Sequence, residues 1–393
     1  MTTPKMTIYG TAWCSDCKRA KKFLGEQRVQ YTWVDIERDA DGQSLVERLN
    51  DGRRVVPTIV FDDGSKLVEP SNAELAAKLG LQTQAAMSFY DLIVVGSGPA
   101  GLTAALYAAR EGLDVLVVER GGLGGQVGIT EVLENYPGFP DGIGGGEFAD
   151  RLTAQARRFG VELLQAQQVD SLGARGNTRC IVTGDGKEYG ARALLLAPGS
   201  TYRRLGIPGE DELIGAGVHF CATCDGPFYK GQHVAVVGGG NSAGEESLFL
   251  TRFVERVTLL VRGPSMSASK LVADKVAANP AIDLRFNTEL RALHGDKRLS
   301  GITVHDKTSD KDEELTPAGL FVFIGLDPNT GWLPPEIRRD QYGFIITSQT
   351  LETSMSGVFA AGDARKGSTK QAASAAGEGA TAALMIREYL RGM

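Results

Sequence analysis

Two segments of the chain follow the same pattern, and this repeat constrains the fold more than any other feature. Residues 90–120, YDLIVVGSGPAGLTAALYAAREGLDVLVVER, read as an apolar strand, a glycine-rich turn, a helix and a second apolar strand. Residues 233–262, HVAVVGGGNSAGEESLFLTRFVERVTLLVR, read in the same order. This order is typical of a βαβ unit. The sequence therefore predicts an α/β protein that contains two such units.

The glycines of the first unit indicate a dinucleotide site. Gly96, Gly98 and Gly101 form a G-x-G-x-x-G turn directly before the helix. Glycines there permit close approach of a pyrophosphate, whose charge the helix N-terminus stabilises. Glu119 lies at the end of the second strand, where its carboxylate can bind a ribose diol and would repel a 2′-phosphate. The alternative is a purely structural glycine turn.

The second unit differs at the position that reads the ribose. Its turn contains Gly238, Gly240 and Ala243, and Arg262 stands where the first unit has Glu119. A cation at this place suits the 2′-phosphate of NADPH. The two units are therefore predicted to bind different dinucleotides. The alternative is that Arg262 is only a solvated residue at a strand end.

Length and charge exclude several classes of protein. A chain of 393 residues is expected to form two or three domains. The net charge is −6 and basic residues are dispersed, which argues against a nucleic-acid partner. The beginning, MTTPKMTIYG, has no apolar run that fits a signal peptide, and no stretch approaches the roughly 20 residues of a membrane span. We expect a cytoplasmic protein without a membrane segment.

Four of the five cysteines form two C-x-x-C pairs, Cys14/Cys17 and Cys221/Cys224. In a reducing compartment such pairs indicate catalysis or metal binding rather than a disulfide scaffold. A C-x-x-C pair can close a readily reduced disulfide, and Asp225 after the second pair could exchange a proton when it opens. The alternative is one zinc ion held by both pairs. Because the pairs lie roughly 200 residues apart, in segments that read as separate domains, we expect no metal site.

The fifth cysteine, Cys180, lies in the apolar segment TRCIVTG, and we expect it to be buried and inert.

The N-terminal segment reads as a small α/β unit of its own, in the order βαβαββα. Ser71 is a candidate N-cap of its last helix, and residues 81–87 read as a linker because they are small or polar and lack periodicity. The expected strands and helices cover, in chain order, residues 6–10, 17–27, 31–36, 44–50, 55–61, 66–69 and 71–79.

From residue 88 onward the chain resembles the low-molecular-weight thioredoxin reductases. The segments that carry the resemblance are GSGPAG (96–101), GGLGGQ (121–126), TEVLENYPGF (130–139), CATCDG (221–226), GGGNSAGEE (238–246) and the late stretch GVFAAGDARKGSTKQAASAAGEGATAA (357–383). This family passes hydride from NADPH to FAD, and electrons from there to a C-x-x-C disulfide and a partner protein. One domain rotates against the other, and the enzyme is typically a homodimer.

The resemblance also implies domain limits and residue roles. An FAD domain at 88–203 and 327–393 would enclose an NAD(P)H domain at 204–326 that carries the redox pair. Cys224 would lie nearest the flavin, Cys221 would attack the partner disulfide and Asp225 would be the acid–base group. The implied FAD contacts are Gly96, Ser97, Gly98, Pro99, Ala100, Glu119, Arg120, Gly125, Gln126, Thr130, Asn135, Gly362, Asp363, Lys370, Gln371 and Ala372. The implied nucleotide contacts are Gly238, Gly240, Asn241, Ser242, Ala243, Glu245, Arg262, Ile324 and Gly325.

One departure from the family concerns the nucleotide. The family usually has His-Arg-Arg and a further Arg after the second strand of this unit, whereas the stretch here is LLVRGPSMSASK. Of these basic residues only Arg262 is present, with Gly263 and Ser267 in place of others. One Arg binds a 2′-phosphate less tightly than three do. NADPH remains the predicted donor, and NADH is the alternative.

Residues 1–80 resemble the thioredoxin fold of glutaredoxins and, more narrowly, of mycoredoxin-like proteins. The segments that carry this resemblance are WCSDC after the first strand and VVPT, where the family has a cis-proline. The resemblance implies that Cys14 is an exposed nucleophile at a helix N-terminus, that Cys17 is the resolving thiol and that Pro57 pairs with the substrate chain. The later stretch DDGSKLVEPSNAEL lacks the Gly-Gly turn of glutathione-binding members. This points away from glutathione and toward mycothiol or a protein disulfide.

Together these features predict a self-contained flavoprotein disulfide reductase, with a thioredoxin-fold domain before two dinucleotide-binding domains. Electrons would pass from NADPH through FAD and Cys221–Cys224 to Cys14–Cys17, and then to a protein disulfide, a low-molecular-weight thiol disulfide or a peroxiredoxin. The nine residues 80–88 span about 30 Å when extended and about 15–18 Å as a flexible coil, and a tether of this kind gives an effective concentration on the order of millimolar.

Two alternatives remain for the N-terminal domain. It could be a docking or regulatory module of an enzyme that reduces a separate thioredoxin, or Cys14 could bind an iron–sulfur cluster between two chains.

Overall fold

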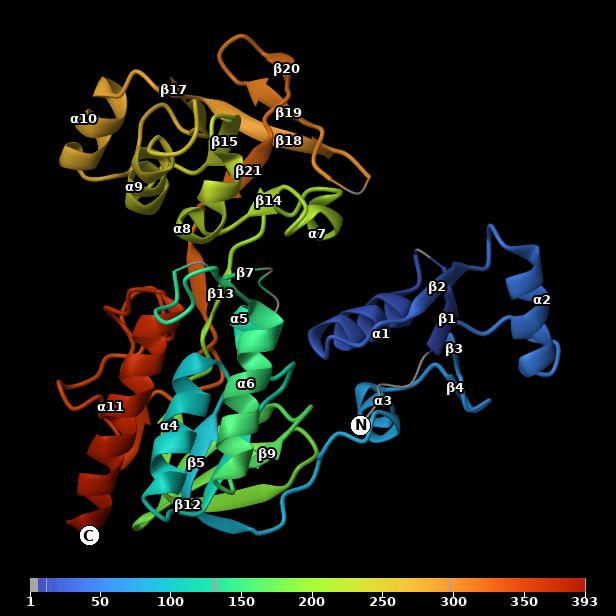
Figure 1. Cartoon of the computed structure of the whole chain (residues 1–393), viewed down its shortest axis with the longest axis vertical. Helices are drawn as coiled ribbons and strands as arrows, with labels where there is room; N and C mark the ends of the chain where they lie inside the picture. Colours follow the sequence, from blue (N-terminus) through green and yellow to red (C-terminus); the bar gives the residue numbers. More distant parts are fainter. Residues whose placement is uncertain are drawn as a thin grey trace. The chain divides into compact units, whose positions relative to one another are not determined.

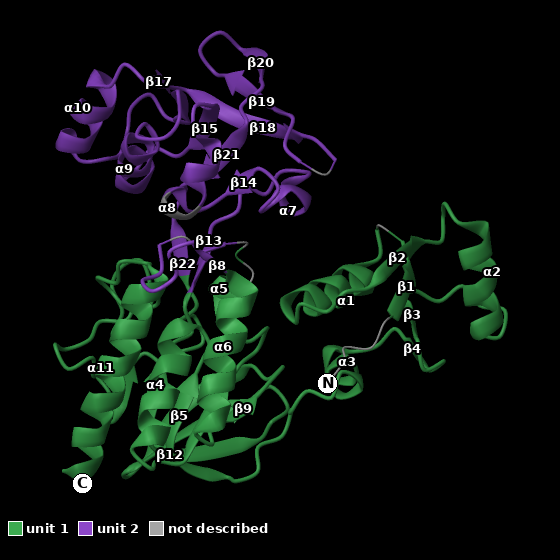
Figure 2. Cartoon of the chain, in the orientation of Figure 1, with its two compact units in different colours: residues 1–130, 144–199, 328–393 green, residues 131–143, 200–327 purple. Residues whose placement is uncertain are grey.

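The structure is a computed structural model that describes residues 6–11, 13–128, 130, 132–133, 135–296 and 298–392, with only the backbone of Thr223 and Cys224 (Figure 1). The chain divides into two compact units (Figure 2). The first unit contains residues 1–130, 144–199 and 328–393, and the second contains residues 131–143 and 200–327. Among the described residues, no helix is both long and apolar enough to cross a membrane.

The N-terminal part of the first unit is a four-stranded sheet with the order β2-β1-β3-β4 and three helices. Its strand β1 pairs in parallel with β2 and antiparallel with β3, so the predicted order βαβαββα is confirmed. These elements are β1 (Met6–Gly10), α1 (Ser15–Glu26), β2 (Thr32–Asp35), α2 (Ala40–Leu49), β3 (Thr58–Phe61), β4 (Lys66–Val68) and α3 (Asn72–Lys78).

Local side chains determine where the helices of this part begin. Helix α2 starts four residues earlier than predicted because Asp39 caps it, accepting the amides of Asp41 and Gly42 at 3.1 Å. Ser71 caps α3 as predicted, in a reciprocal capping box with Glu74. Both caps satisfy amides that have no partner inside the helix.

The remainder of the first unit is built on a sheet with the order β10-β11-β12-β5-β6-β9, to which β23 adds by pairing with β12. The first βαβ unit is confirmed as β5, α4 and β6, and its two strands are parallel. Helix α4 packs against α6 and α11 (Figure 1). The elements are β5 (Phe89–Val95), α4 (Pro99–Arg110), β6 (Val115–Val118), α5 (Gly125–Gly128), α6 (Gly145–Arg158), β9 (Glu162–Leu164), β10 (Val169–Arg175), β11 (Thr178–Thr183), β12 (Glu188–Leu196), β23 (Val358–Ala360) and α11 (Ala372–Arg391).

The second unit has a five-stranded parallel sheet with the order β14-β21-β15-β16-β17. The second βαβ unit is confirmed as β15, α9 and β16. Its main elements are α7 (Glu210–Leu213), β14 (Val218–His219), α8 (Ala222–Asp225), the 3-10 helix η1 (Gly226–Tyr229), β15 (His233–Val237), α9 (Asn241–Leu250), β16 (Arg256–Leu260), α10 (Lys270–Ala278), β17 (Ile282–Arg285) and β21 (Gly319–Val322).

Smaller sheets complete the chain. One is an antiparallel sheet of three strands in the second unit, and two are single strand pairs. The three strands are β18 (Thr288–His294), β19 (Gly301–Asp306) and β20 (Lys311–Leu315), and the pairs are β7 (Val132–Leu133) with β8 (Ile143–Gly144) and β13 (Ser200–Tyr202) with β22 (Leu326–Pro328).

Candidate redox and dinucleotide sites

The glycine turn before α4 is shaped so that only glycine fits at two positions. Gly96 has φ +102°, and a Cβ there would lie 2.2 Å from the carbonyl oxygen of Ala197. A Cβ at Gly101 would lie 1.9 Å from the carbonyl oxygen of Gly96. Gly98 is the N-cap of α4, and among the described residues no side chain caps this helix. The first amides of α4 are therefore available to a phosphate.

Glu119 is held rigidly beside this turn. Its Oε2 accepts hydrogen bonds from the backbone amide and the hydroxyl of Ser97, both at 2.8 Å, and its Oε1 accepts the amide of Gly121 at 2.7 Å. Among the described residues, Oε1 accepts a single bond and therefore has a further lone pair for a ribose hydroxyl. The predicted ribose acid is therefore oriented before any ligand binds.

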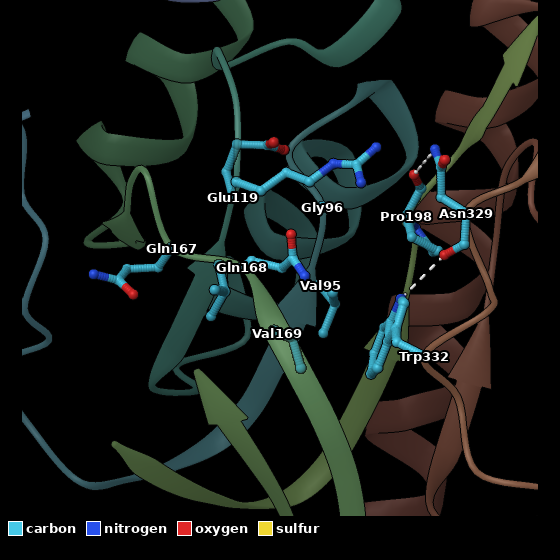
Figure 3. A pocket seen from close by; sticks show the side chains of 11 residues that line it. Val95, Gly96, Glu119, Gln167, Gln168, Val169, Pro198, Asn329 and Trp332 are labelled. Carbon is cyan, nitrogen blue, oxygen red and sulfur yellow. Dashed lines mark hydrogen bonds between the residues drawn. The ribbon is translucent and has the colours of Figure 1, made fainter. Parts of the chain in front are cut away.

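A cavity opens beside Glu119 and the glycine turn (Figure 3). Gly96, Glu119 and Arg120 line it together with Pro198, Asn329 and Trp332, which come from later segments of the chain. Asn329 donates to the carbonyl of Pro198 at 2.9 Å, and the Trp332 indole donates to the carbonyl of Asn329 at 3.0 Å. The side of the cavity formed by Asn329 and Trp332, together with the polar side chains of Glu119 and Arg120, fits the adenosine part of a dinucleotide.

Residues from the end of the sequence lie next to the same turn. A Cβ at Gly362 would lie 3.0 Å from Ala100 Cβ, and one at Gly379 would lie 2.1 Å from the Ala100 carbonyl oxygen. The helices α4 and α11 thus meet with almost no space between their backbones. A Cβ at Gly125 would likewise lie 3.2 Å from Gly98 Cα. Two further predicted FAD segments, residues 121–126 and 357–383, therefore meet the start of α4, as a cradle for this cofactor requires.

Two ionisable groups near α11 are partly withdrawn from water. Burial raises the pKa of Asp363 and lowers the pKa of Lys370, because each loses hydration of its charged form. Lys370 Nζ donates to the Asp363 carbonyl oxygen at 2.5 Å. Of the other predicted FAD contacts, Thr130 donates its hydroxyl to the carbonyl of Gln126 at 3.0 Å, and Asn135 belongs to the second unit.

The second glycine turn has the same construction. Gly238 has φ +149°, and a Cβ there would lie 2.3 Å from the carbonyl oxygen of Phe323. Gly240 is the N-cap of α9, which has no side-chain cap in the described part of the chain. Ala243 is fully buried at the first turn of this helix. These residues fit a second dinucleotide.

The loop after β16 folds back onto this turn. Ser267 donates its amide to the Gly239 carbonyl at 2.7 Å, and Asn241 Oδ1 accepts the amide of Ser269 at 2.7 Å. Arg262 is exposed. The remaining predicted contacts in this unit comprise Ser242 and Glu245 on α9 and, after β21, Ile324 and Gly325, of which Gly325 has φ +115°.

The second cysteine pair lies at the start of α8. Cys221 is half-buried and forms part of a disulfide, and the amide of Asp225 donates to its carbonyl oxygen at 3.1 Å. One helical turn therefore places Asp225 on the same side as Cys221. The Cys224 side chain lies outside the described part of the structure.

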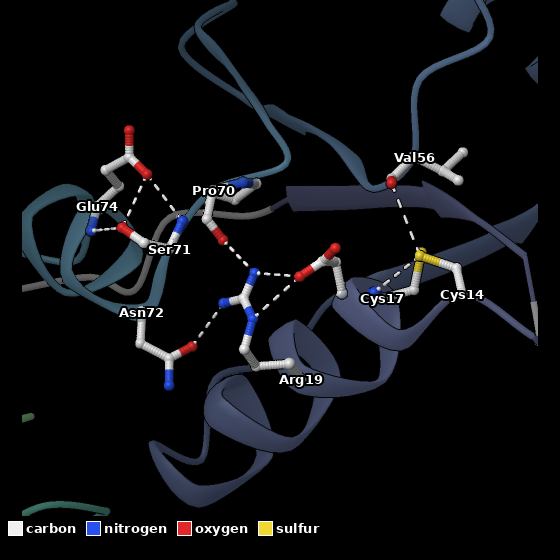
Figure 4. A network of polar contacts seen from close by, with 9 residues as sticks. Cys14, Cys17, Arg19, Val56, Pro70, Ser71, Asn72 and Glu74 are labelled. Atoms are coloured by element: carbon white, nitrogen blue, oxygen red, sulfur yellow. Dashed lines mark hydrogen bonds and ion pairs between the residues drawn. The ribbon is translucent and has the colours of Figure 1, made fainter.

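The first cysteine pair lies at the start of α1 (Figure 4). The Cys14 sulfur accepts the amide of Cys17 at 3.0 Å and lies 3.6 Å from the carbonyl oxygen of Val56. The Val56–Pro57 peptide is cis, which confirms that prediction. Burial raises the pKa of Cys17 to about 12. The prediction that Cys14 is exposed is wrong, because only 6% of the residue is accessible where its sulfur packs beneath Val56.

Asp16, for which the sequence offers no function, anchors a neighbouring turn. Its Oδ1 binds Arg19 at 3.1 Å, and Arg19 also donates to the carbonyl of Pro70 at 2.7 Å and to Asn72 Oδ1 at 2.9 Å (Figure 4). Arg19 thereby joins the dithiol helix to the start of α3. Cys180 is buried with a free thiol, which confirms its predicted burial.

The linker at 81–87 forms hydrogen bonds with Glu162 and Gln165, which lie in and just after strand β9 of the same unit. Glu162 accepts hydrogen bonds from the Gln82 side chain and the Ala86 amide, both at 2.6 Å, and from the Tyr90 hydroxyl at 2.7 Å. The amide of Gln165 donates to the Gln82 carbonyl at 2.7 Å. The span expected of a free coil therefore applies only when these bonds break.

The far end of α1 contacts residues that follow Glu119. Gln27 donates its side-chain amide to the carbonyl of Gly121 at 2.8 Å. Arg28 donates to the carbonyl of Gly146 and to Asp150, both at 2.6 Å. The sequence contained no signal for this contact, because each side of it reads as an ordinary exposed surface.

Two dinucleotide turns and a disulfide followed by an acid define a flavin- and nicotinamide-dependent disulfide oxidoreductase. The family model described as pyridine nucleotide-disulphide oxidoreductase matches residues 90–379, and the glutaredoxin model matches residues 6–65. The chain therefore belongs to the pyridine nucleotide-disulphide oxidoreductase family and has an N-terminal glutaredoxin domain.

Named relatives agree with this assignment. The thioredoxin reductase of Treponema pallidum is 42% identical over 301 residues, which cover 77% of this chain and 97% of that protein. The bifunctional thioredoxin reductase/thioredoxin of Mycobacterium leprae is 44% identical over 304 residues, 77% of this chain and 66% of that protein. The structure of thioredoxin reductase from Streptococcus pyogenes superimposes with a TM-score of 0.73 at 37% identity, covering 78% of this chain and 99% of that one.

The comparisons confirm the predicted fold class and the resemblance. The chain is an enzyme of the thioredoxin reductase type with a glutaredoxin domain.

Proposed function

We propose that this enzyme passes electrons from NADPH, through FAD and the Cys221–Cys224 pair, to the Cys14–Cys17 pair and then to an external disulfide. The observation that carries the proposal is the presence of two separate cysteine pairs in one chain, each at the start of a helix. When bound, FAD supplies the two-electron carrier between the nicotinamide and the disulfide. The glycine turn before α4, with Glu119, would hold FAD, and the turn before α9, with Arg262, would hold NADPH.

The thiols themselves perform the exchange. Cys221 attacks Cys14 of the oxidised N-terminal pair, and Cys17 leaves as a thiol. Cys224 then attacks Cys221, which releases Cys14 and closes the disulfide Cys221–Cys224. Asp225, one helical turn after Cys221, takes up the proton of the attacking thiol and returns it.

Within the N-terminal pair, Cys14 attacks the external disulfide. Its sulfur accepts the amide of Cys17 at the start of α1, which places Cys14 at the N-terminal end of this helix. Burial raises the pKa of Cys17 to about 12 and holds it as a thiol until Cys14 has formed the mixed disulfide. Cys17 therefore resolves the mixed disulfide in the second step.

A protein disulfide, for example in a peroxiredoxin or a thioredoxin-type protein, is the favoured acceptor. The amide of Ser71, at the start of α3, already donates to Glu74 at 2.7 Å, and the Ser71 hydroxyl lies 2.8 Å from the same carboxylate oxygen. These groups are therefore not available to a small acidic thiol. A mycothiol-type disulfide is the second candidate. A cytoplasmic homodimer with the family's domain limits, 88–203, 204–326 and 327–393, completes the proposal.

A cysteine series tests the relay. Purified protein is given NADPH and a small aliphatic disulfide, and NADPH oxidation is followed. We expect Cys14→Ser to lose at least about tenfold in rate, because the exit thiol is gone, and Cys180→Ser, a buried cysteine in the same unit, to match the unsubstituted protein. A Cys14→Ser rate equal to that of the Cys180→Ser control would refute the relay.

The contact of α1 favours a second candidate, in which the N-terminal domain is a docking module and a separate thioredoxin is reduced. Gln27 binds the carbonyl of Gly121, two residues after Glu119, and Arg28 binds that of Gly146 in α6, so the domain can influence the dinucleotide site without its thiols. Thioredoxin reduction that survives Cys14→Ser but falls in Arg28→Ala would support this candidate. The reverse pattern would support the relay.

A further inference from the structure

A buried histidine lies beside the redox pair of the second unit. His219 is the last residue of β14, two positions before Cys221, and only 8% of it is exposed. Its ring packs against those of Phe321 and Tyr229, with centroids 5.3 and 5.4 Å apart. A buried imidazole is costly unless its nitrogens have partners, so its contacts carry information.

Both ring nitrogens of His219 face polar groups. Nε2 lies 2.6 Å from the Tyr229 hydroxyl, and Nδ1 lies 3.5 Å from Oδ2 of Asp225. The short contact fits a Tyr229 O–H that donates to Nε2. The ring proton of the neutral imidazole is then on Nδ1 and points toward the carboxylate.

The partners of His219 are themselves fixed in place. The Tyr229 ring lies against Gly319, where a Cβ would be 2.5 Å from the ring. Asp225 is held one turn after Cys221 by the hydrogen bond between their backbones, and its side chain is 19% exposed. The three side chains come from β14, α8 and η1, so the cluster requires the folded unit.

We propose that His219 is a positioning residue for Asp225, which it orients through Nδ1 for proton exchange with the Cys221 thiol, while Tyr229 selects the required tautomer. The inference rests on the proposed function, in which Asp225 serves Cys221. It adds two buried groups, His219 and Tyr229, to a site for which the sequence indicated only the two cysteines and one acid.

The Cys221 thiol gives its proton to the Asp225 carboxylate, and the resulting thiolate attacks one sulfur of the acceptor disulfide. The acceptor S–S bond breaks and a mixed disulfide forms. The Cys224 thiol then attacks Cys221, which closes the intramolecular disulfide and releases the second acceptor sulfur. Asp225 returns its proton to one of the two released thiolates, and the proton of the Cys224 thiol goes to the other. Two electrons and two protons pass from the dithiol to the acceptor, and His219 stays unchanged.

Among the described side chains, few other charged groups lie near the cluster. Strand β21, which pairs with β14, consists of Gly319–Val322 and contributes no titratable side chain. Helix α9 packs against α8 and carries Glu245 and Glu246, and burial raises the pKa of Glu246. Within this described part, Asp225 and Tyr229 are the ionisable groups that lie against the His219 ring nitrogens.

Histidine NMR tests the geometry without any reaction. The chain has four histidines, so selective ¹⁵N labelling gives a spectrum that His219→Gln assigns. We expect His219 to carry its ring proton on Nδ1, with an Nδ1–H resonance that moves in Asp225→Asn, because this proton points toward the carboxylate. His305 pairs with Asp312 at 2.8 Å, so Asp312→Asn is the matched control and moves the resonances of His305 alone. An Nε2-protonated ring, or an Nδ1 resonance of His219 unchanged by Asp225→Asn, overturns the proposal.

Thiol reactivity tests the consequence. The full chain, with Cys14, Cys17 and Cys180 replaced by Ser, is reduced with dithiothreitol, and the rate of its reaction with an aromatic disulfide is measured between about pH 6 and 9. We expect His219→Gln to react about five- to tenfold more slowly near neutral pH, and Tyr229→Phe to lose less. His233→Gln changes a histidine of the same unit, 2.9 Å from Thr258, and should react like the unsubstituted protein.

The double variant separates the role of His219 from that of Asp225. If His219 acts through Asp225, adding His219→Gln to Asp225→Asn slows the reaction no further. A slow Asp225→Asn with an unimpaired His219→Gln overturns the role of His219 and leaves the proposed function intact. An Asp225→Asn variant as fast as the unsubstituted protein overturns the assignment of Asp225 itself.

Discussion

Replacement of Gly96 by alanine tests whether the first glycine turn is built for a cofactor. A Cβ adds about 1–2 kcal/mol of backbone strain at φ +102°. It would also lie 2.2 Å from the Ala197 carbonyl, which cannot retreat freely because the Ala197 amide is bonded to Val95 at 2.8 Å. Overpacking of this kind costs about 1–3 kcal/mol more. We expect Gly96→Ala to lower the free energy of unfolding by about 2–5 kcal/mol.

The matched control is Gly112→Ala in the same unit. Gly112 has φ +84°, and a Cβ there would meet no described atom within 4 Å, so this variant carries the strain without the clash. Urea unfolding followed by circular dichroism gives both free energies, and flavin absorbance after gel filtration gives the FAD content. We expect Gly112→Ala to retain FAD and Gly96→Ala to lose it. Full FAD content in Gly96→Ala, with stability equal to that of Gly112→Ala, would refute the reasoning.

Three further predictions follow from single contacts. Glu162→Ala removes the acceptor that holds the linker, so proteinase K should cleave this variant near residues 81–87 several-fold faster than the control Glu147→Ala. The control loses a surface ion pair with Arg151. Equal cleavage of the two variants would contradict a linker held in place by Glu162. Cys17, with a pKa of about 12, is about one-thousandth ionised at pH 9, so iodoacetamide should modify Cys14 first. The free energy of unfolding should also fall as the pH rises above 9, because Cys17 loses its proton at lower pH in the unfolded chain. Faster modification of Cys17 than of Cys14 would contradict the raised pKa. Arg262→Ala should raise the KM for NADPH about tenfold and leave that for NADH nearly unchanged, and equal changes would remove Arg262 from the phosphate site.

Local patterns allowed the sequence to predict much of the architecture. Both βαβ units, the capping of α3 by Ser71 and the burial of Cys180 depend on residues close together in the chain. Hydrophobic periodicity and glycine turns report on such short segments directly. The start of α2 was misplaced because the capping role of Asp39 was not recognised.

Contacts between distant residues were beyond these patterns. The linker was expected to span its length as a flexible coil, yet Glu162 accepts hydrogen bonds from two of its residues, Gln82 and Ala86. Cys14 was expected to be exposed because its fold family uses it as a nucleophile, but the packing of Val56 over its sulfur is a tertiary property. Neither the hydrogen bonds of the linker nor the burial of Cys14 can be read from the sequence.

The sequence by itself determined the class of enzyme, because the chemistry of that class lies in short motifs: two glycine turns, two C-x-x-C pairs and the acids and cations placed beside them. Only the tertiary structure gave Asp16 a function, through Arg19 and the turn at Pro70. Only the tertiary structure, likewise, brought His219 and Tyr229 to Asp225, since the hydrogen-bond geometry of three side chains on separate elements depends on how β14, α8 and η1 pack. A motif records which groups are present, whereas the direction in which they point is decided by packing.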